Sequence, residues 1–211
     1  MLTTRADPPL RPQGLKPLDL FVDEEHVRAW PGGSGDRKVA NNYAPTVRPT
    51  MDAERDHGCP QVLYLLPDGS GDTERAAVSE AGTMNMFFVF NKGDAGLELC
   101  TPPLNGTILP GVTRDSLLQL ARGFGGIAVN ERDVTIGELS GASKAGALLE
   151  CFGSGTAAVV SPVQRLKRAS GEVIECKSDM ESKDTLCWRL YETLTGIQTG
   201  RISHEWSECF E

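Results

Sequence analysis

Short apolar runs that end at proline or glycine recur along this chain, and they restrict the folds open to it. Residues 61–66 (QVLYLL) are rich in strand-forming types and lie between a proline and the turn-forming residues 67–69 (PDG). Residues 84–90 form a second run, and residues 91–96 (NKGDAG) then turn the chain into residues 97–100, which predicts a hairpin. Two further strands are predicted on either side of a glycine-rich loop, over residues 148–152 and 157–163.

Helical patterns alternate with these runs. A helix capped by Thr113 and ended by Gly123 is predicted from its apolar face. Residues 135–138 (TIGE) have the spacing of a capping box, which predicts another short helix. A last helix is predicted over about residues 183–195, with Gly196 as its end. Strands and helices mixed with hairpins favour an α/β fold with a mixed sheet over a doubly wound parallel one.

Composition narrows the class of protein. A chain of 211 residues usually forms one domain, occasionally two, and buries a substantial core. The net charge of -8 argues against a nucleic-acid partner, because such a surface needs a basic stripe. No apolar run approaches the ~20 residues that span a bilayer, so no membrane partner is expected.

Cysteines and histidines suggest neither a disulfide scaffold nor a metal site. The six cysteines are scattered without a Cys-x-x-Cys pair, and the three histidines lack metal-ligand spacing. We therefore expect reduced thiols in an intracellular protein of the cytoplasm or the mitochondrion, and no bound metal.

The N-terminal stretch differs from the rest in composition. Residues 1–17 carry four prolines and few apolar side chains, so they are predicted to form an extended arm or the remnant of an interdomain linker. Residues 18–211 are then predicted to form a single domain.

A lysine in a glycine-rich setting is the first candidate for chemistry. Lys38 lies in GDRKVANNY (residues 35–43), directly after GGSG (residues 32–35), whose glycines allow close approach of the backbone to a ligand. A lysine amine can form an imine with an aldehyde and can then carry a proton, provided its pKa is low enough. Most single lysines are solvated charges, so the assignment depends on the motifs downstream.

Three more motifs follow in order. Glu80 lies in SEAGTMN (residues 79–85), and two glycine-bearing loops follow it, LPGVTR (residues 109–114) and FGSGTA (residues 152–157). A glycine that opens a helix offers backbone N–H groups and the positive helix end to an anion, and Thr156 adds a hydroxyl. One amine, one acid and two anion cradles fit a site for pyridoxal 5'-phosphate (PLP).

The order and the residue sequences of these motifs resemble those of the large C-terminal domain of the branched-chain amino acid aminotransferases. These are fold-type IV PLP enzymes with the fold of D-amino acid aminotransferase. The resemblance runs from about Gly14 to the C-terminus and implies transamination of leucine, isoleucine or valine with 2-oxoglutarate. It covers one half of such an enzyme, so the chain is expected to be a truncated form, and a homodimer where the small domain is present.

At the ring end of the cofactor, the resemblance assigns three residues. Lys38 is the catalytic residue that forms the aldimine with PLP. Tyr43 hydrogen-bonds the ring hydroxyl oxygen, and Glu80 faces the pyridine nitrogen and keeps it protonated, so that the ring withdraws electrons. For Tyr43 the alternative is an ordinary core aromatic with a satisfied hydroxyl.

At the phosphate end, the resemblance assigns backbone amides and one hydroxyl. The amides of Val112 and Thr113 and the side chain of Thr156 bind the phosphate. Thr156 also borders the substrate, and the amide of Ala157 binds the substrate α-carboxylate.

The chain departs from the family pattern near the lysine and at the positions of a redox-active cysteine pair that some members carry. Ala40 and Asn41 replace two glycines, and Ala158 and Ser161 stand where animal members can carry a Cys-x-x-Cys pair. The family's small domain supplies an arginine to the phosphate, and neither Arg48 nor Arg114 lies where that arginine would come from.

Two alternatives to a branched-chain aminotransferase stay open. One is another fold-type IV PLP enzyme, such as a D-amino acid aminotransferase or an aminodeoxychorismate lyase. The other is a catalytically inactive truncated homologue that acts as a binding partner.

Overall fold

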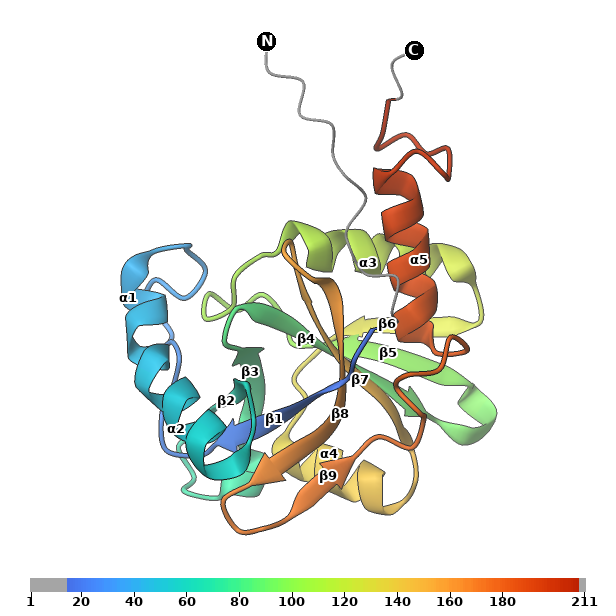
Figure 1. Cartoon of the computed structure of the whole chain (residues 1–211). Coiled ribbons are helices and arrows are strands. Elements are labelled where there is room, and N and C mark those ends of the chain that lie inside the picture. The colour runs from blue at the N-terminus through green and yellow to red at the C-terminus, as the bar shows by residue number, and fades with distance from the viewer. Residues whose placement is uncertain (1–14, 209–211) are drawn as a thin grey trace.

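The computed structural model of the protein describes residues 15–208, where nine strands and five α-helices alternate (Figure 1). The strands are β1 (Leu18–Asp23), β2 (Gln61–Leu66), β3 (Ala77–Ala81), β4 (Met84–Asn91), β5 (Leu97–Thr101), β6 (Ile127–Glu131), β7 (Leu148–Gly155), β8 (Val159–Arg168) and β9 (Val173–Glu175). The α-helices are α1 (Ala40–Tyr43), α2 (Val47–His57), α3 (Val112–Phe124), α4 (Ile136–Lys144) and α5 (Leu186–Gln198). Short 3-10 turns lie at η1 (Ala44–Thr46), η2 (Thr73–Arg75) and η3 (Gly93–Ala95).

All nine strands belong to one mixed sheet in the order β3-β2-β1-β8-β7-β4-β5-β6, with β9 paired to β8. Strand β1 is parallel to β2 and β8, and β5 is parallel to β6, whereas the other neighbours are antiparallel. The additional pairing of β3 with β4 closes the strands from β3 round to β4 into a barrel-like ring. The prediction of an α/β fold with a mixed sheet is therefore confirmed.

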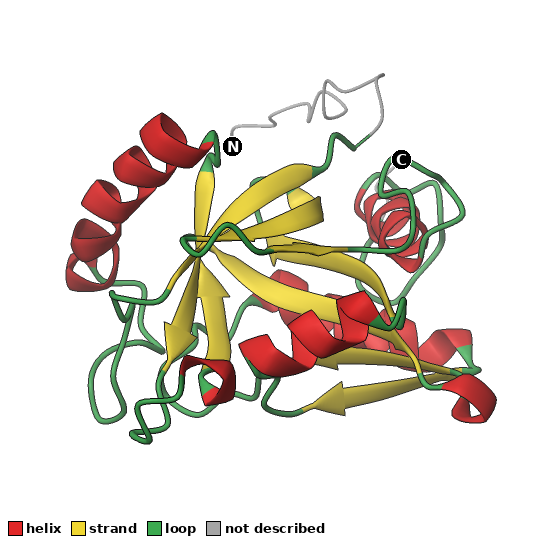
Figure 2. Cartoon of the chain, turned by 90° about the horizontal axis from the view of Figure 1, so that it is seen from below, coloured by secondary structure: helices red, strands yellow, loops and turns green. Residues whose placement is uncertain are grey.

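The core fills this ring and the space beneath two helices. Strand β4 is buried along almost its whole length, and Phe87 stacks on Phe152 of β7 with ring centroids 5.2 Å apart. Helices α3 and α5 pack together through leucines such as Leu117 and Leu190, while α2 packs on β1 and β2. Figure 2 shows the strands fanned out with the helices on their outside. Each fully buried large apolar side chain contributes about 1.5–3 kcal/mol.

Several predicted elements are confirmed. Strand β2 matches the predicted residues 61–66, and β4 and β5 form the predicted hairpin. The Thr135 side chain accepts a hydrogen bond from the Glu138 backbone N–H at 3.1 Å, so the predicted cap opens α4.

The predicted limits of two helices are wrong. Gly111, not Thr113, is the N-cap of α3, and this helix continues past Gly123 to Phe124. Gly196 does not end α5; it lies inside the helix, where a side chain would come within 2.6 Å of Ile202 Cδ1. The glycine is needed for close packing there, which a sequence pattern cannot distinguish from a helix stop.

The predicted strand at residues 157–163 begins later than expected. The strand before it runs on to Gly155, residues 156–158 form a turn, and β8 starts at Val159. Periodicity predicted none of β1, α1, α2, β6 and β9. The predicted arm over residues 1–17 lies outside the described residues except for residues 15–17, which precede β1 without helix or strand. Within residues 15–208, no helix is long and apolar enough to cross a membrane.

Candidate active site

Three adjacent strands present polar side chains in one row. Glu80 on β3 pairs with Asn85 on β4, and Asn85 pairs in turn with Ser154 on β7. Directly opposed residues of antiparallel strands project from the same face, so these three side chains share one surface of the sheet. All three are buried.

The two turns that follow these strands also meet. A Cβ atom on Gly155 would lie 3.4 Å from the carbonyl oxygen of Thr83, which belongs to the β3–β4 turn. Thr156 and Ala157 follow Gly155 in the β7–β8 turn, and both are exposed. The sheet therefore ends in adjacent loops that carry two of the predicted motifs.

Glu80 is held by donors on both carboxylate oxygens. Its Oε1 accepts hydrogen bonds from the Leu109 backbone N–H at 2.6 Å and from Asn85 Nδ2 at 2.8 Å. Its Oε2 lies 2.9 Å from Arg28 Nη2 in a buried ion pair. Burial raises the pKa of Glu80 to about 7, against the lowering effects of Arg28, the Leu109 amide, Arg114 and Asn85.

The start of α3 is tied to the same carboxylate. Asn85 Nδ2 also donates to the Leu109 carbonyl oxygen at 2.9 Å, and a Cβ atom on Gly111 would collide with Asn85 Oδ1. Only glycine allows the helix to begin this close to β4. The first-turn N–H groups of Val112 and Thr113 have no partner within the helix, so they and the helix dipole can bind an anion.

The lysine loop is fixed by side chains at its ends. Asn42 Nδ2 donates to the Arg37 carbonyl oxygen at 2.7 Å, and Asn41 Nδ2 donates to Ser34 Oγ at 2.8 Å. Asn41 therefore closes the loop where the family pattern has glycine. Lys38 itself is exposed on this loop.

Arg28 links the lysine loop to Glu80. Its Nη1 donates to the carbonyl oxygens of Gly35 at 3.5 Å and Thr107 at 3.2 Å. Its guanidinium carbon also lies 5.8 Å from the ring centre of half-buried Tyr43. The structure thus brings Gly35 and Tyr43, on either side of Lys38 in the sequence, together with Glu80 and the segment before α3.

The β7–β8 turn stores backbone strain next to Thr156. Val159 has φ 60, a conformation that a β-branched residue rarely adopts, and Val160 N–H donates to the Ala158 carbonyl oxygen at 2.7 Å. Such outliers cost about 1–3 kcal/mol and cluster at functional sites. A groove of about 440 Å³ runs beside this turn, lined by Leu15, Ala157 and Tyr191 among others.

Arg48 and Arg114 are both engaged elsewhere. Arg48 pairs with Asp52 on the exposed side of α2, and Arg114 pairs with Glu131 and donates to the Pro102 carbonyl oxygen. Both arginines are therefore already paired with a carboxylate.

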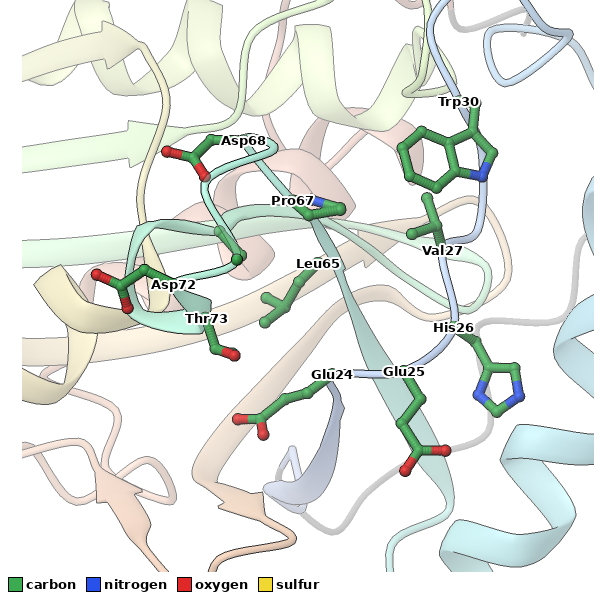
Figure 3. A pocket seen from close by; sticks show the side chains of 12 residues that line it. Glu24, Glu25, His26, Val27, Trp30, Leu65, Pro67, Asp68, Asp72 and Thr73 are labelled. Atoms are coloured by element: carbon green, nitrogen blue, oxygen red, sulfur yellow. The ribbon is translucent and has the colours of Figure 1, made fainter.

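A second pocket has a volume of about 330 Å³, and Figure 3 shows the side chains that line it. Its lining includes the carboxylates of Glu24, Glu25, Asp68 and Asp72, which repel an anion. It contains none of the predicted site residues, so we do not assign the phosphate to it.

The row on the sheet fits the ring and phosphate of PLP. The buried Ser154 Oγ has no hydrogen-bond partner among the described residues, which is unusual for a buried hydroxyl. The glycine at the start of α3 leaves room above Asn85, and no carboxylate belongs to the set Val112, Thr113 and Thr156. The motifs assigned no role to Arg28, Asn85 or Ser154. Arg28 lies outside the motifs, and its partners Glu80 and Thr107 lie far from it in the sequence.

The family described as Amino-transferase class IV matches residues 2–166, and the chain belongs to this family. Enzymes of this class use PLP. The branched-chain-amino-acid aminotransferase of Dictyostelium discoideum is 43% identical over 201 residues, which cover 94% of this chain and 50% of that relative. The mitochondrial branched-chain-amino-acid aminotransferase of Mus musculus is 44% identical, with 91% and 47% covered.

Solved structures of branched-chain amino acid aminotransferases also match the fold of this chain. The branched-chain amino acid aminotransferase from Escherichia coli matches with a TM-score of 0.68 and 27% identity, covering 90% of this chain and 56% of that one. The PLP form of the branched-chain amino acid aminotransferase from Thermobaculum terrenum shares the fold, with a TM-score of 0.68 and 24% identity, covering 89% and 53%. The predicted family and fold are confirmed, and the chain spans about half the length of the curated relatives it matches.

Proposed function

We propose that this chain forms the cofactor-binding half of a branched-chain amino acid aminotransferase. The reaction would exchange the amino group of leucine, isoleucine or valine with 2-oxoglutarate. The observation that carries the proposal is the buried Glu80 carboxylate, held by donors and tied to both the lysine loop and the start of α3. The relatives with this activity support it, since they match over nearly the whole chain.

When bound, PLP supplies an aldehyde that reacts with amines and a ring that withdraws electrons from the substrate carbon. Lys38 would hold the cofactor through its amine and would move the proton at the substrate carbon. Its exposed position on a tethered loop allows both tasks. Tyr43 donates its hydroxyl hydrogen bond to the ring oxygen, and Glu80 accepts the ring N–H.

The phosphate is held by the amides of Val112 and Thr113 and by the Thr156 hydroxyl. The Ala157 amide, in the strained turn, binds the substrate α-carboxylate. Residues 18–211 therefore act as one PLP-binding domain in this proposal. We propose that the whole protein is a homodimer in the cytosol or the mitochondrion, and the relatives named for these two compartments support the location.

Single-turnover measurements with a panel of substrates test the function. The PLP-loaded chain is mixed with L-leucine, L-isoleucine, L-valine, D-alanine and aminodeoxychorismate, and the cofactor spectrum is followed. We expect the three branched-chain L-amino acids to convert the cofactor fastest, and 2-oxoglutarate to restore it. Lys38→Ala is the matched control and should not respond.

Two results would contradict the proposal. Faster conversion by D-alanine, or release of product from aminodeoxychorismate, would indicate one of the other fold-type IV enzymes. Binding of PLP without conversion by any substrate, in the chain joined to the missing half of a relative, would indicate an inactive homologue.

A further inference from the structure

Arg28 is a buried charge that the proposed function does not yet use. It follows β1, and its side chain is 1% exposed, whereas most arginines lie at the surface. Its Nε atom has no hydrogen-bond partner among the described residues. A guanidinium in such a place is costly to bury, so its position calls for a reason.

The groups that contact the Glu80 carboxylate are all hydrogen-bond donors. A carboxylate offers about four lone-pair positions, and three are filled by the Leu109 amide, Asn85 Nδ2 and Arg28 Nη2. None of these groups can accept a proton. The shell therefore fits an ionised Glu80, and one acceptor position on Oε2 stays open for a fourth donor.

Charge decides whether Glu80 stays ionised in this buried place. Burial favours the protonated acid, and two positive groups oppose it, Arg28 from the segment after β1 and Arg114 from α3. Arg28 is the one in direct contact. A protonated Glu80 would donate a hydrogen bond to a pyridine nitrogen, and an ionised one accepts from it.

The same guanidinium also contacts the loop that carries Lys38. Its second nitrogen holds the carbonyl oxygens of Gly35, in the lysine loop, and Thr107, in the loop before α3. Gly35 packs so closely on Thr107 that a Cβ atom would lie 2.5 Å from its carbonyl oxygen. One side chain therefore contacts the acid and both loops, through donors on two of its nitrogens.

We propose that Arg28 is a positioning residue that favours the ionised form of Glu80, so that Glu80 accepts rather than donates the hydrogen bond at the cofactor ring nitrogen. The role of Arg28 in catalysis rests on the proposed function, but its effect is on the protonation of one glutamate. It can therefore be tested on the cofactor-free chain.

The experiment follows the infrared C=O band of a protonated carboxyl group while the cofactor-free chain is titrated. Burial also raises the pKa of Glu150, so Glu80→Gln is used to identify the band that belongs to Glu80. In Arg28→Met, we expect the midpoint of this band to rise by about one to three pH units relative to the parent chain. In Arg28→Lys, which keeps the charge, we expect the midpoint to stay near that of the parent.

Unfolding of Arg28→Met would be resolved by the double variant Arg28→Met/Glu80→Gln. A folded double variant supports the proposal, because the single variant then failed through an uncompensated carboxylate. An unfolded double variant overturns it, since Arg28 would be needed whatever the charge of residue 80. An unchanged midpoint in folded Arg28→Met, or a raised one in Arg28→Lys, overturns it as well.

A second readout separates this inference from the proposed function. With ¹⁵N-labelled PLP bound, the ring nitrogen resonance should report a protonated ring in the parent chain and an unprotonated ring in Arg28→Met. Failure of the parent to bind PLP would contradict the proposed function and leave the infrared result to decide on Arg28. A protonated ring in both chains would contradict the role of Arg28 alone.

Discussion

Two buried glutamates of the same sheet behave in opposite ways. Glu80 on β3 faces one fully buried arginine, Arg28, and burial raises its pKa to about 7. Glu98 on β5 faces Arg132 and Lys92, both partly exposed, and these partners lower its pKa to about 2. An arginine beside a carboxylate therefore does not fix the direction of a pKa shift; hydration and the number of partners do.

The two clusters differ in what they leave open. Glu98, Arg132 and Glu138 join β5 to α4 through charged hydrogen bonds within the cluster. Glu80 keeps an open acceptor position next to the start of α3, at the edge where we propose that the cofactor binds. The first arrangement stabilises the fold, and the second holds a titratable group ready for a ligand.

Removal of the Glu80 carboxylate should have the largest effect on the rate of the reaction. Glu80→Ala removes the acceptor for the ring N–H, so single-turnover conversion with leucine should slow by about a hundredfold or more, while some PLP binding remains. Glu98→Ala is the matched control and should convert at the parent rate if folded. Equal rates for the parent and Glu80→Ala would show that the electron-withdrawing role of this residue is wrong.

The phosphate contact should have the next largest effect. Thr156→Val keeps the shape of the side chain and removes one donor to an anion, which is worth about 1.5–3 kcal/mol. The dissociation constant for PLP, measured by titration, should rise about ten- to a hundredfold. Thr193→Val on the exposed side of α5 is the control. Unchanged affinity in Thr156→Val would rule the contact out.

Breaking the Glu98 cluster should affect stability and not chemistry. Glu98→Gln should lower the free energy of unfolding by about 2 kcal/mol at neutral pH, because charged hydrogen bonds to Arg132 are lost. The folded pKa of about 2 lies below the ordinary value of 4.5, so the stabilisation is present above pH 4.5 and is lost as the pH falls towards 2. Denaturant unfolding at several pH values measures this, and a difference that persists in acid would contradict it.

Glu80→Gln should show the opposite dependence on pH. The folded pKa of about 7 lies above the ordinary value of 4.5, so the folded parent takes up a proton between these values and loses stability as the pH rises through this window. The free energy of unfolding of Glu80→Gln should not fall in this way. Parallel curves for the parent and Glu80→Gln would show that Glu80 does not titrate there.

The smallest effect concerns the helix that holds Glu138. Thr135→Ala removes the cap of α4 and should cost about 1 kcal/mol of stability, seen as a lower denaturant midpoint. Affinity for PLP should not change, because the side-chain hydrogen bonds of Thr135 and Glu138 go to α4 and Arg132 and not to Glu80, Asn85 or Ser154. A matching loss of PLP affinity would show that the two regions are coupled.

Signals from neighbouring residues were enough to predict some of the secondary structure and some of the candidate site. The strand at residues 61–66, the β4–β5 hairpin and the Thr135 cap depend on neighbouring residues, and the motifs around Lys38 and Glu80 are continuous. The contacts that give Glu80 its properties are not local. Arg28 reaches it only because β1 lies between β2 and β8, a pairing that no run of residues encodes. Gly196 shows the same limit, since its role depends on the side chain of Ile202.

Reductive labelling of the PLP-bound chain can identify the lysine that binds the cofactor. Borohydride fixes the cofactor on the lysine that reacted with it, and peptide mapping then identifies that residue. We expect label on Lys38 and none on Lys144, Lys167 or Lys183. These three lysines pair with Glu172, with Asp19 and with the ring of Trp188, respectively. Reproducible label on one of those three instead of Lys38 would contradict the assignment of the active site.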